Sequence, residues 1–383
     1  MNSPSRPPIT NHPRGHPTEF EQIIQEKSHN FVGREFVFTV INEFLHRNNQ
    51  GYFTIIGPPG SGKSAILAKY ATDNVDVVYY NAELHGKNRA NEFLRNICTQ
   101  LIHQYSLNYT FLPDNATEGS WFLSSLLQQI SDQLQPNQKL IIAIDGLNFI
   151  DRNSQSPGTN LFYLPRYLPD KVYFLLTRRP FLREKSGLLI ETPSQSLDLA
   201  DYPEQNQQDI QAYIQNYLTP NEEIPPTLLE KRDLKSWLSD YQINEQEFCD
   251  RLSSQSDNNF MYLSAIINAT LVGFYPKPFQ YNQLPPNLAA YYQQHLQNMM
   301  RSAPDEELRL AILKILIQHQ PITVEALAKL MPQRLAHTID VDEYEIEEVL
   351  ENWLEYLKQQ QNNRDDYSLY HSSFRHWLSQ QII

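Results

Sequence analysis

Short apolar runs alternate with helical stripes through the first 200 residues of the chain. Four runs rich in apolar, β-branched and aromatic residues predict strands at 52–56, 75–80, 140–145 and 172–177, and a weaker signal, Leu-Asp-Leu, predicts one at 197–199. Between them, apolar residues recur at helical spacing, as in 93–102 and 121–130. Continuous apolar strands that alternate with helices are typical of a parallel sheet with helices on both faces. The pattern therefore predicts an α/β domain over residues 28–200.

Helical stripes replace the strand pattern beyond about residue 205, and they predict an all-α helical domain over 201–300. Three further stripes follow, the last running from Ile346 to Leu357, and then a brief alternation at 367–370 leads into a final helix. Three helices followed by a short β element are typical of a winged-helix domain, which we expect over 301–383. Prolines among polar residues predict a disordered leader over 1–27.

The composition mainly excludes certain partners and certain kinds of site. The 383 residues carry 31 Lys and Arg against 44 Asp and Glu, and the resulting net charge of −13 argues against nucleic acid as a partner. Two cysteines, Cys98 and Cys249, are too few for a disulfide framework or a structural zinc site. No apolar run approaches the roughly 18 residues that span a membrane. We therefore expect a soluble, cytoplasmic protein without a membrane partner.

The candidate chemistry begins directly after the first predicted strand. The motif G-x-x-x-x-G-K-[ST] is matched in full by Gly57, Pro58, Pro59, Gly60, Ser61, Gly62, Lys63 and Ser64. In such a loop, backbone N–H groups surround a phosphate, Lys63 reaches the β and γ phosphates, and Ser64 ligates Mg²⁺. A glycine-rich turn can match by chance, but the strand before it and the apolar-faced helix after it favour a phosphate site. We therefore expect ATP or ADP and Mg²⁺ as cofactors.

Two later strand ends carry charged residues that belong to the same chemistry. Asp145 ends an apolar strand, where an aspartate lies beside the Mg²⁺ of a nucleotide fold. Taken alone it is an ordinary acid at the end of a buried strand; its position after the phosphate loop favours the metal role. Arg178 ends the next strand and is placed to sense the γ-phosphate, with a solvated strand-end charge as the alternative. We predict Lys63, Asp145 and Arg178 as catalytic residues.

These motifs together resemble the STAND class of P-loop ATPases, which are signalling switches of the NACHT and apoptotic-ATPase type. The segment 31–35 is similar to the adenine-side segment of that class and of origin-recognition AAA+ proteins, and 209–214, 259–262 and 284–286 resemble its helical domain. The segment 370–374 resembles the winged-helix segment whose histidine faces the β-phosphate of ADP. The resemblance thus adds nucleotide-binding residues to the phosphate loop: Val32, Gly33, Arg34, Ala65 and His371.

The chain also departs from that class. Relatives often carry an acid three or four residues after the strand-end aspartate, where it polarises the attacking water, but here those positions are Asn148 and Phe149. Loss of a general base typically costs 10²- to 10⁴-fold in rate, so we expect slow hydrolysis unless Asp151 substitutes. For His371, a packed core histidine remains the alternative to a phosphate contact. Sensor repeats and an effector are not recognised, so sensing and output are expected to lie in a protein partner.

The resemblance implies a nucleotide-dependent switch. ATP in place of ADP would open the chain, so that it forms a homo-oligomer or engages its partner. Two alternatives remain: a pseudo-ATPase scaffold that holds nucleotide as a structural ligand, and an origin-recognition-like AAA+ protein that binds DNA.

Overall fold

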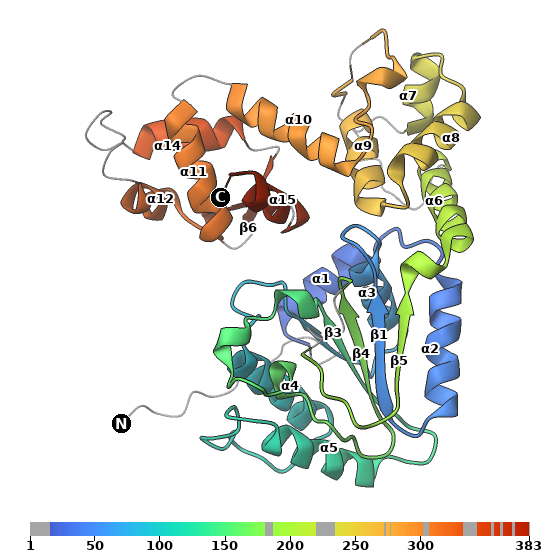
Figure 1. Ribbon diagram of the computed structural model, residues 1–383, viewed down its shortest axis with the longest axis vertical. Coiled ribbons are helices and arrows are strands. Elements are labelled where there is room, and N and C mark those ends of the chain that lie inside the picture. The colour runs from blue at the N-terminus through green and yellow to red at the C-terminus, as the bar shows by residue number, and fades with distance from the viewer. Residues whose placement is uncertain are drawn as a thin grey trace. The chain divides into compact units, whose positions relative to one another are not determined.

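The computed structural model folds into two compact units, each described here on its own (Figure 1). Unit 1 comprises residues 1–253 and 258–263, and unit 2 comprises 254–257 and 264–383. The structure describes residues 16–180, 187–219, 234–271, 273–275, 277–301, 306–331, 343–353, 356–360, 363–369 and 372–382. The boundaries expected at residues 200 and 300 do not coincide with this division, because residues 201–253 cluster with the sheet.

A five-stranded parallel sheet forms the centre of unit 1. Its strands are β1 (Gly51–Ile56), β2 (Val78–Asn81), β3 (Leu140–Asp145), β4 (Val172–Arg178) and β5 (Ser194–Asp198), in the order β2-β3-β4-β1-β5. Every residue of β4 is buried, and β1 is buried except at its last residue. Because successive side chains of a strand point to opposite faces, this burial requires cover on both faces. The predicted strands and their parallel arrangement are confirmed.

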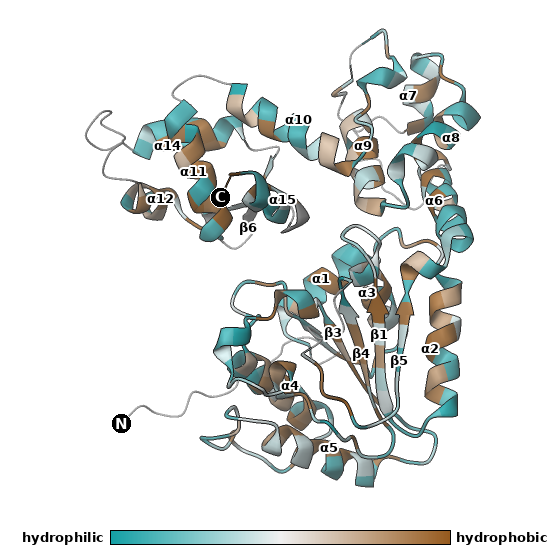
Figure 2. Ribbon diagram, in the orientation of Figure 1, coloured by the Kyte–Doolittle hydropathy of each residue, from teal (hydrophilic) through white to brown (hydrophobic). Residues whose placement is uncertain are grey.

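Helices supply that cover and join the strands. The helices of the sheet region are α1 (Thr18–Ser28), α2 (Glu35–Arg47), α3 (Lys63–Asp73), α4 (Ala90–Gln104) and α5 (Trp121–Gln133). Short 3-10 turns lie at η1 (Leu147–Phe149), η2 (Arg152–Ser154), η3 (Leu161–Tyr163) and η5 (Leu199–Asp201). Figure 2 shows the hydrophobic colouring concentrated on the strands and on the helix faces toward them. Since all strands run parallel, the loops that follow them meet at one edge of the sheet.

The expected disordered leader is wrong for residues 18–27, because α1 spans them. Phe20 is fully buried and contacts the rings of Tyr79 and Tyr80 at centroid distances of 6.1 and 5.2 Å. An ion pair of 2.8 Å between Lys87 and Glu19 fastens the same helix. The prediction of disorder followed from the proline content of this segment, although its buried residues are spaced as on one face of a helix. Residues 1–15 lie outside the described part of the chain.

Helices without strands complete unit 1. They are α6 (Pro203–Leu218), α7 (Leu234–Asp240) and α8 (Glu245–Ser256) as far as Ser253, followed by the start of α9 (Phe260–Leu271). From Ser264 onward α9 belongs to unit 2.

Unit 2 is mainly helical and carries one small antiparallel sheet. After η7 (Tyr281–Gln283) come α10 (Leu288–Arg301), α11 (Glu306–Gln318), α12 (Val324–Leu330), α14 (Glu343–Asn352), β6 (Leu357–Gln360), β7 (Asn363–Leu369) and α15 (Ser372–Ile382). Strands β6 and β7 pair, and an isolated bridge joins Ile322 to Tyr367. The helix predicted as far as Leu357 ends at Asn352, and Leu357 instead begins β6.

Aromatic packing holds the centre of unit 2. Phe374 lies 5.1 Å from Tyr292 and 5.9 Å from His295, measured between ring centroids. Burial lowers the pKa of His295 to about 4, so this histidine is neutral at physiological pH. The indole N–H of Trp353 donates to the backbone carbonyl of Met299 at 2.9 Å. Among the described residues, no helix is both long and apolar enough to cross a bilayer.

Candidate functional site

The motif loop lies at the sheet edge where the strands end, between β1 and α3. Gly60 and Gly62 adopt φ values of +81° and +87°, a conformation that L side chains rarely adopt. Gly62 is the N-cap of α3, and no side chain caps that helix end. The first N–H groups of a helix have no partner within it, so they and the helix dipole favour an anion at this position. Ser64 and Ala65 lie in this first turn and are half-buried.

Lys63 binds the loop itself in this structure. Its Nζ donates to the backbone carbonyls of Gly57 and Pro58, each at 2.8 Å, and lies 3.4 Å from Ser61 Oγ. Burial lowers the pKa of Lys63 to about 8, and the positive charge of Arg179 acts in the same direction. The carboxylates of Asp145, Glu83 and Asp198 oppose this shift. Lys63 is therefore a half-buried cation whose charged form is favoured by three acidic groups.

Asp145 is held by neutral hydrogen-bond donors from both neighbouring strands. Its exposed fraction is 1%. The amide of Asn81, at the end of β2, donates to Oδ2 at 3.1 Å, and the hydroxyl of Thr177 in β4 donates to Oδ1. The Thr177 hydroxyl also accepts from the backbone N–H of Gly146 at 2.8 Å. We call Asn81, Asp145 and Thr177 the strand-end network.

Sequence reasoning identified Asp145 but missed its two partners. The predicted second strand ended one residue before Asn81, and the strand end at Thr177 and Arg178 was included in the family resemblance without a role for the Thr177 hydroxyl. A usable signal was present, because polar residues that end otherwise apolar strands meet at the same edge of a parallel sheet.

The two arginines at the end of β4 have different surroundings: Arg178 is its last residue and Arg179 follows it. Arg178 is buried, and both its burial and the charge of Arg152 lower its pKa to about 10. Its backbone carbonyl accepts from the N–H of Gly57 at 3.3 Å. Arg179 is half-buried, lies 5.5 Å from the centroid of the Phe149 ring, and acts electrostatically on Lys63. The structure thus brings the charge of Arg179 to the phosphate loop.

Arg34 is bonded to protein groups on three sides. Its exposed fraction is 2%, and its guanidinium donates to the Ser61 carbonyl at 2.8 Å and to the side chain of Asn206. Its Nε lies 3.5 Å from Asp209, and its guanidinium carbon lies 4.9 Å from the centroid of the Phe260 ring. Burial lowers the pKa of Arg34 to about 10, against the effect of Asp209, so it stays charged at neutral pH.

Arg34 therefore links the phosphate loop to α6. The preceding residues, Val32 and Gly33, are half-buried, and Gly33 has a φ of +72°. A Cβ atom at Gly33 would overlap the Asp209 carboxylate, so the contact requires glycine.

The start of α9 also binds the loop. The backbone N–H of Phe260 donates to the Gly60 carbonyl at 2.9 Å, and the Asn259 amide donates to the Pro59 carbonyl at 3.0 Å. A side chain at Gly60 would overlap Asn259. Arg34, Asp209, Asn259 and Phe260 are called the helical-side contacts below.

Of the remaining candidate residues, the structure describes all but His371. Asp151 accepts from the backbone N–H of Asn153 at 3.0 Å and so caps η2. Asn148 is exposed, and Phe149 lies against Arg179. His371 lies outside the described residues.

The hydroxyl of Ser64 and the carboxylate of Asp145 are the oxygen groups predicted to hold Mg²⁺. Within the described ranges, no group of three His, Cys, Asp or Glu side chains could hold a metal ion. This donor set fits Mg²⁺ bound together with a nucleotide, because Mg²⁺ keeps several waters and takes phosphate oxygens as ligands.

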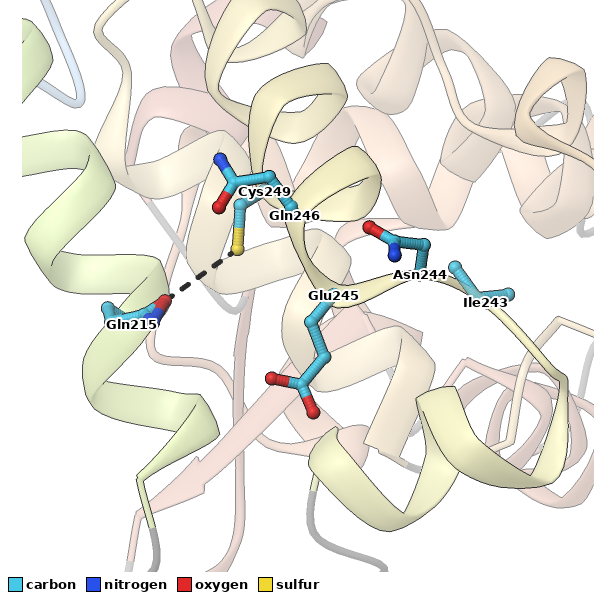
Figure 3. Close-up of a pocket in the computed structure, with 6 residues that line it drawn as sticks. All are labelled: Gln215, Ile243, Asn244, Glu245, Gln246 and Cys249. Carbon is cyan, nitrogen blue, oxygen red and sulfur yellow. Dashed lines mark hydrogen bonds between the residues drawn. The ribbon is translucent and has the colours of Figure 1, made fainter.

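A second recess lies away from the motif loop. Figure 3 shows it lined by Gln215, Ile243, Asn244, Glu245, Gln246 and Cys249. The Cys249 thiol lies 3.9 Å from Gln215 Oε1. Burial and the neighbouring acids Asp250 and Glu245 raise the pKa of this thiol, so it is a poor nucleophile.

Comparison with known proteins locates a family resemblance in the same region. Residues 30–175 match the family described as an AAA ATPase domain. This segment resembles an AAA-type P-loop ATPase domain. The match covers residues 31–35, the motif loop, the strand-end aspartate and most of β4. No curated protein matches the chain.

Solved structures add only distant likenesses. A Walker-type ATPase of Pyrococcus abyssi is 13% identical, with 91% of this chain and 96% of that one covered and a TM-score of 0.36. The Drosophila ORC bound to DNA is 14% identical, with coverages of 94% and 98% and a TM-score of 0.40. A RuvB mutant of Thermotoga maritima is 12% identical, with coverages of 90% and 94% and a TM-score of 0.31. At these scores the likenesses carry no argument about function.

Proposed function

We propose that unit 1 binds ATP and ADP with Mg²⁺ at the loop from Gly57 to Ser64. The observation that carries this proposal is that Lys63, at an uncapped helix N-terminus, lies in the electrostatic field of the buried Asp145. The cation and the helix end attract phosphate oxygens, while the carboxylate attracts a divalent cation. Both groups lie at one edge of a parallel sheet, and the AAA-like match includes them.

Each residue of the proposed site would have its own role in nucleotide binding. Lys63 would leave the loop carbonyls to contact the β and γ phosphates, and the N–H groups at the start of α3 would surround the β-phosphate. The Ser64 hydroxyl would hold Mg²⁺ directly and Asp145 through water, where the metal neutralises phosphate charge. Arg34 would act by holding the loop and not by touching nucleotide, because its hydrogen bonds are made to protein groups. Val32 and Gly33 remain proposed for the adenine side.

At a finer level, we propose a STAND-type switch with slow hydrolysis. The helical-side contacts support this role, because α9 donates directly to the Gly60 carbonyl. A phosphate that reshapes the loop would change this bond, so the helical part would register which nucleotide is bound. The output would be self-association or binding of a protein partner that supplies the sensor or effector. A scaffold that binds nucleotide without turnover is distinguished from it by measured hydrolysis.

A DNA-binding AAA+ protein is the second candidate. It is favoured by the order of elements in unit 2, where the helices α11, α12 and α14 precede the antiparallel strand pair β6–β7, as in a winged helix. Helix α14 has the sequence EYEIEEVLEN and carries no basic residue, so it would repel a phosphate backbone. A winged helix that binds protein fits this charge better. A nanomolar, sequence-dependent DNA shift at physiological salt would instead establish the second candidate.

Calorimetry of Mg-ATP and Mg-ADP binding tests the main proposal. Lys63→Ala should weaken ATP binding by at least about tenfold, because it removes a charge-assisted contact to the phosphates. Lys69→Ala is the matched control: this lysine lies on the same helix, in an exposed ion pair with Asp73 at 2.8 Å, and its loss should leave affinity unchanged. Equal affinity in wild type and Lys63→Ala would contradict the proposal.

A further inference from the structure

We propose that Glu83 is the carboxylate that accepts a proton from the water attacking the γ-phosphate. This inference rests on the proposed ATP site. The region after β3 carries no acid at the positions where relatives often have the general base, because those positions are Asn148 and Phe149. The Asp151 carboxylate caps η2. Asp145 is buried and bonded to Asn81 and Thr177, as suits a group that faces a metal.

The backbone places Glu83 next to Asp145. Glu83 follows β2 by two residues, and β2 pairs with β3 in a register that sets Asn81 opposite Asp145. The side chain of Asn81 joins the two: its Oδ1 accepts from the backbone N–H of Glu83 at 2.8 Å, while its Nδ2 donates to Asp145. A Cβ atom at Gly146 would lie 3.7 Å from the Glu83 nitrogen. The start of the Glu83 loop is therefore fixed beside the end of β3.

Glu83 lies at the sheet edge that carries the phosphate loop, because it follows the carboxyl end of β2 and the loop follows the carboxyl end of the parallel strand β1. Its side chain is exposed. Asp198 is the rival carboxylate at this edge, but it ends β5, on the other side of β1 from β4 and β3. Of these two acids, Glu83 is the exposed one on the Asp145 side.

The proposed step conserves atoms and charge. The oxygen of a water molecule forms a bond to the γ-phosphorus as the Glu83 carboxylate takes one of its protons. The bond from the γ-phosphorus to the bridging β–γ oxygen breaks, and its electron pair stays on that oxygen, which becomes part of ADP. The proton then passes from Glu83 to the released phosphate, and the carboxylate is restored.

Single-turnover hydrolysis of ATP, measured beside Mg-ATP affinity, tests this assignment. Glu83→Gln keeps the shape and removes the base, so hydrolysis should fall by about 10²-fold or more while Mg-ATP affinity stays within about threefold. Glu83→Asp should recover part of the rate. Asp151→Asn, which changes the other acid of this region, is the matched control and should hydrolyse at the wild-type rate. Melting temperatures with and without Mg-ATP report whether each variant folds and binds nucleotide.

The outcomes separate this inference from the proposed function. If wild type fails to bind Mg-ATP, the proposed function is wrong and the inference falls with it. If ATP binds but Glu83→Gln hydrolyses at the wild-type rate, or the wild type shows no hydrolysis, only the assignment of Glu83 is overturned. A variant that loses Mg-ATP affinity but keeps its turnover per bound nucleotide would make Glu83 a binding residue and would also overturn it.

Discussion

The strand-end network and the helical-side contacts both lie near the sheet edge of the candidate site, but they use charge in opposite ways. In the network, Asp145 accepts hydrogen bonds from a neutral amide and a neutral hydroxyl, so its negative charge remains available to a cation. On the helical side, the charge of Arg34 is matched inside the protein by Asp209. The strand-end network therefore has a charge that can serve a ligand, whereas the charges of the helical-side contacts hold the protein around it.

The two regions also differ in how far along the chain they reach. Asn81 and Asp145 are 64 residues apart, whereas Arg34 and Asp209 are 175 apart and Asn259 and Pro59 are 200 apart. Contacts made across such separations exist only when the whole of unit 1 is folded. The comparison therefore predicts that mutations on the helical side act mainly on stability, and mutations at the strand ends mainly on nucleotide chemistry.

Removal of Arg34 should give the largest effect on stability. Arg34→Met leaves Asp209 in a buried position without its cation, which typically costs about 3–5 kcal/mol. Arg251→Met is the matched control, because Arg251 forms an exposed i,i+4 pair with Glu247 at 3.0 Å that contributes about 0.3–0.5 kcal/mol at most. Chemical denaturation measures both. Similar losses in the two variants would show that the buried ion pair is not what holds α6 to the loop.

The two arginines at the end of β4, Arg178 and Arg179, should have a smaller and more selective effect. If Arg179 contacts the γ-phosphate, Arg179→Ala should weaken ATP binding by about tenfold and leave ADP binding unchanged. Arg178→Ala should lower stability but affect ATP and ADP alike, because Arg178 is buried beside Arg152. Calorimetry with both nucleotides distinguishes them. A selective loss of ATP binding in Arg178→Ala would return the sensing role to the residue first predicted from the sequence.

The pH dependence of ATP binding should show the smallest effect. The pKa of Lys63 is lowered to about 8 without nucleotide, and bound phosphate would raise it. Binding then takes up a proton above pH 8, so affinity should fall by about five- to tenfold from pH 7.5 to pH 9. Lys63→Ala should show a flat profile over that range. An equally steep fall in the variant would assign the proton to another group.

The sequence predicted those features whose residues are close together along the chain. Four of the five strands, β1 to β4, have their own apolar runs, and the motif at 57–64 is contiguous, so both were predicted. The role of Arg34 was not, because a buried arginine is recognised only from partners on α6 and α9 that lie far along the chain. Glu83 was missed for a related reason: its importance depends on β2 pairing with β3, and a strand run does not reveal its neighbour.

An experimental structure of the full chain with Mg-ADP tests the central claim most directly. We expect the β-phosphate to lie at the first N–H groups of α3 and Lys63 Nζ to contact phosphate oxygens in place of the Gly57 and Pro58 carbonyls. We also expect Mg²⁺ to bind Ser64 and to lie near Asp145. Nucleotide bound elsewhere, or a loop in which Lys63 keeps both carbonyl contacts under saturating Mg-ADP, would contradict it.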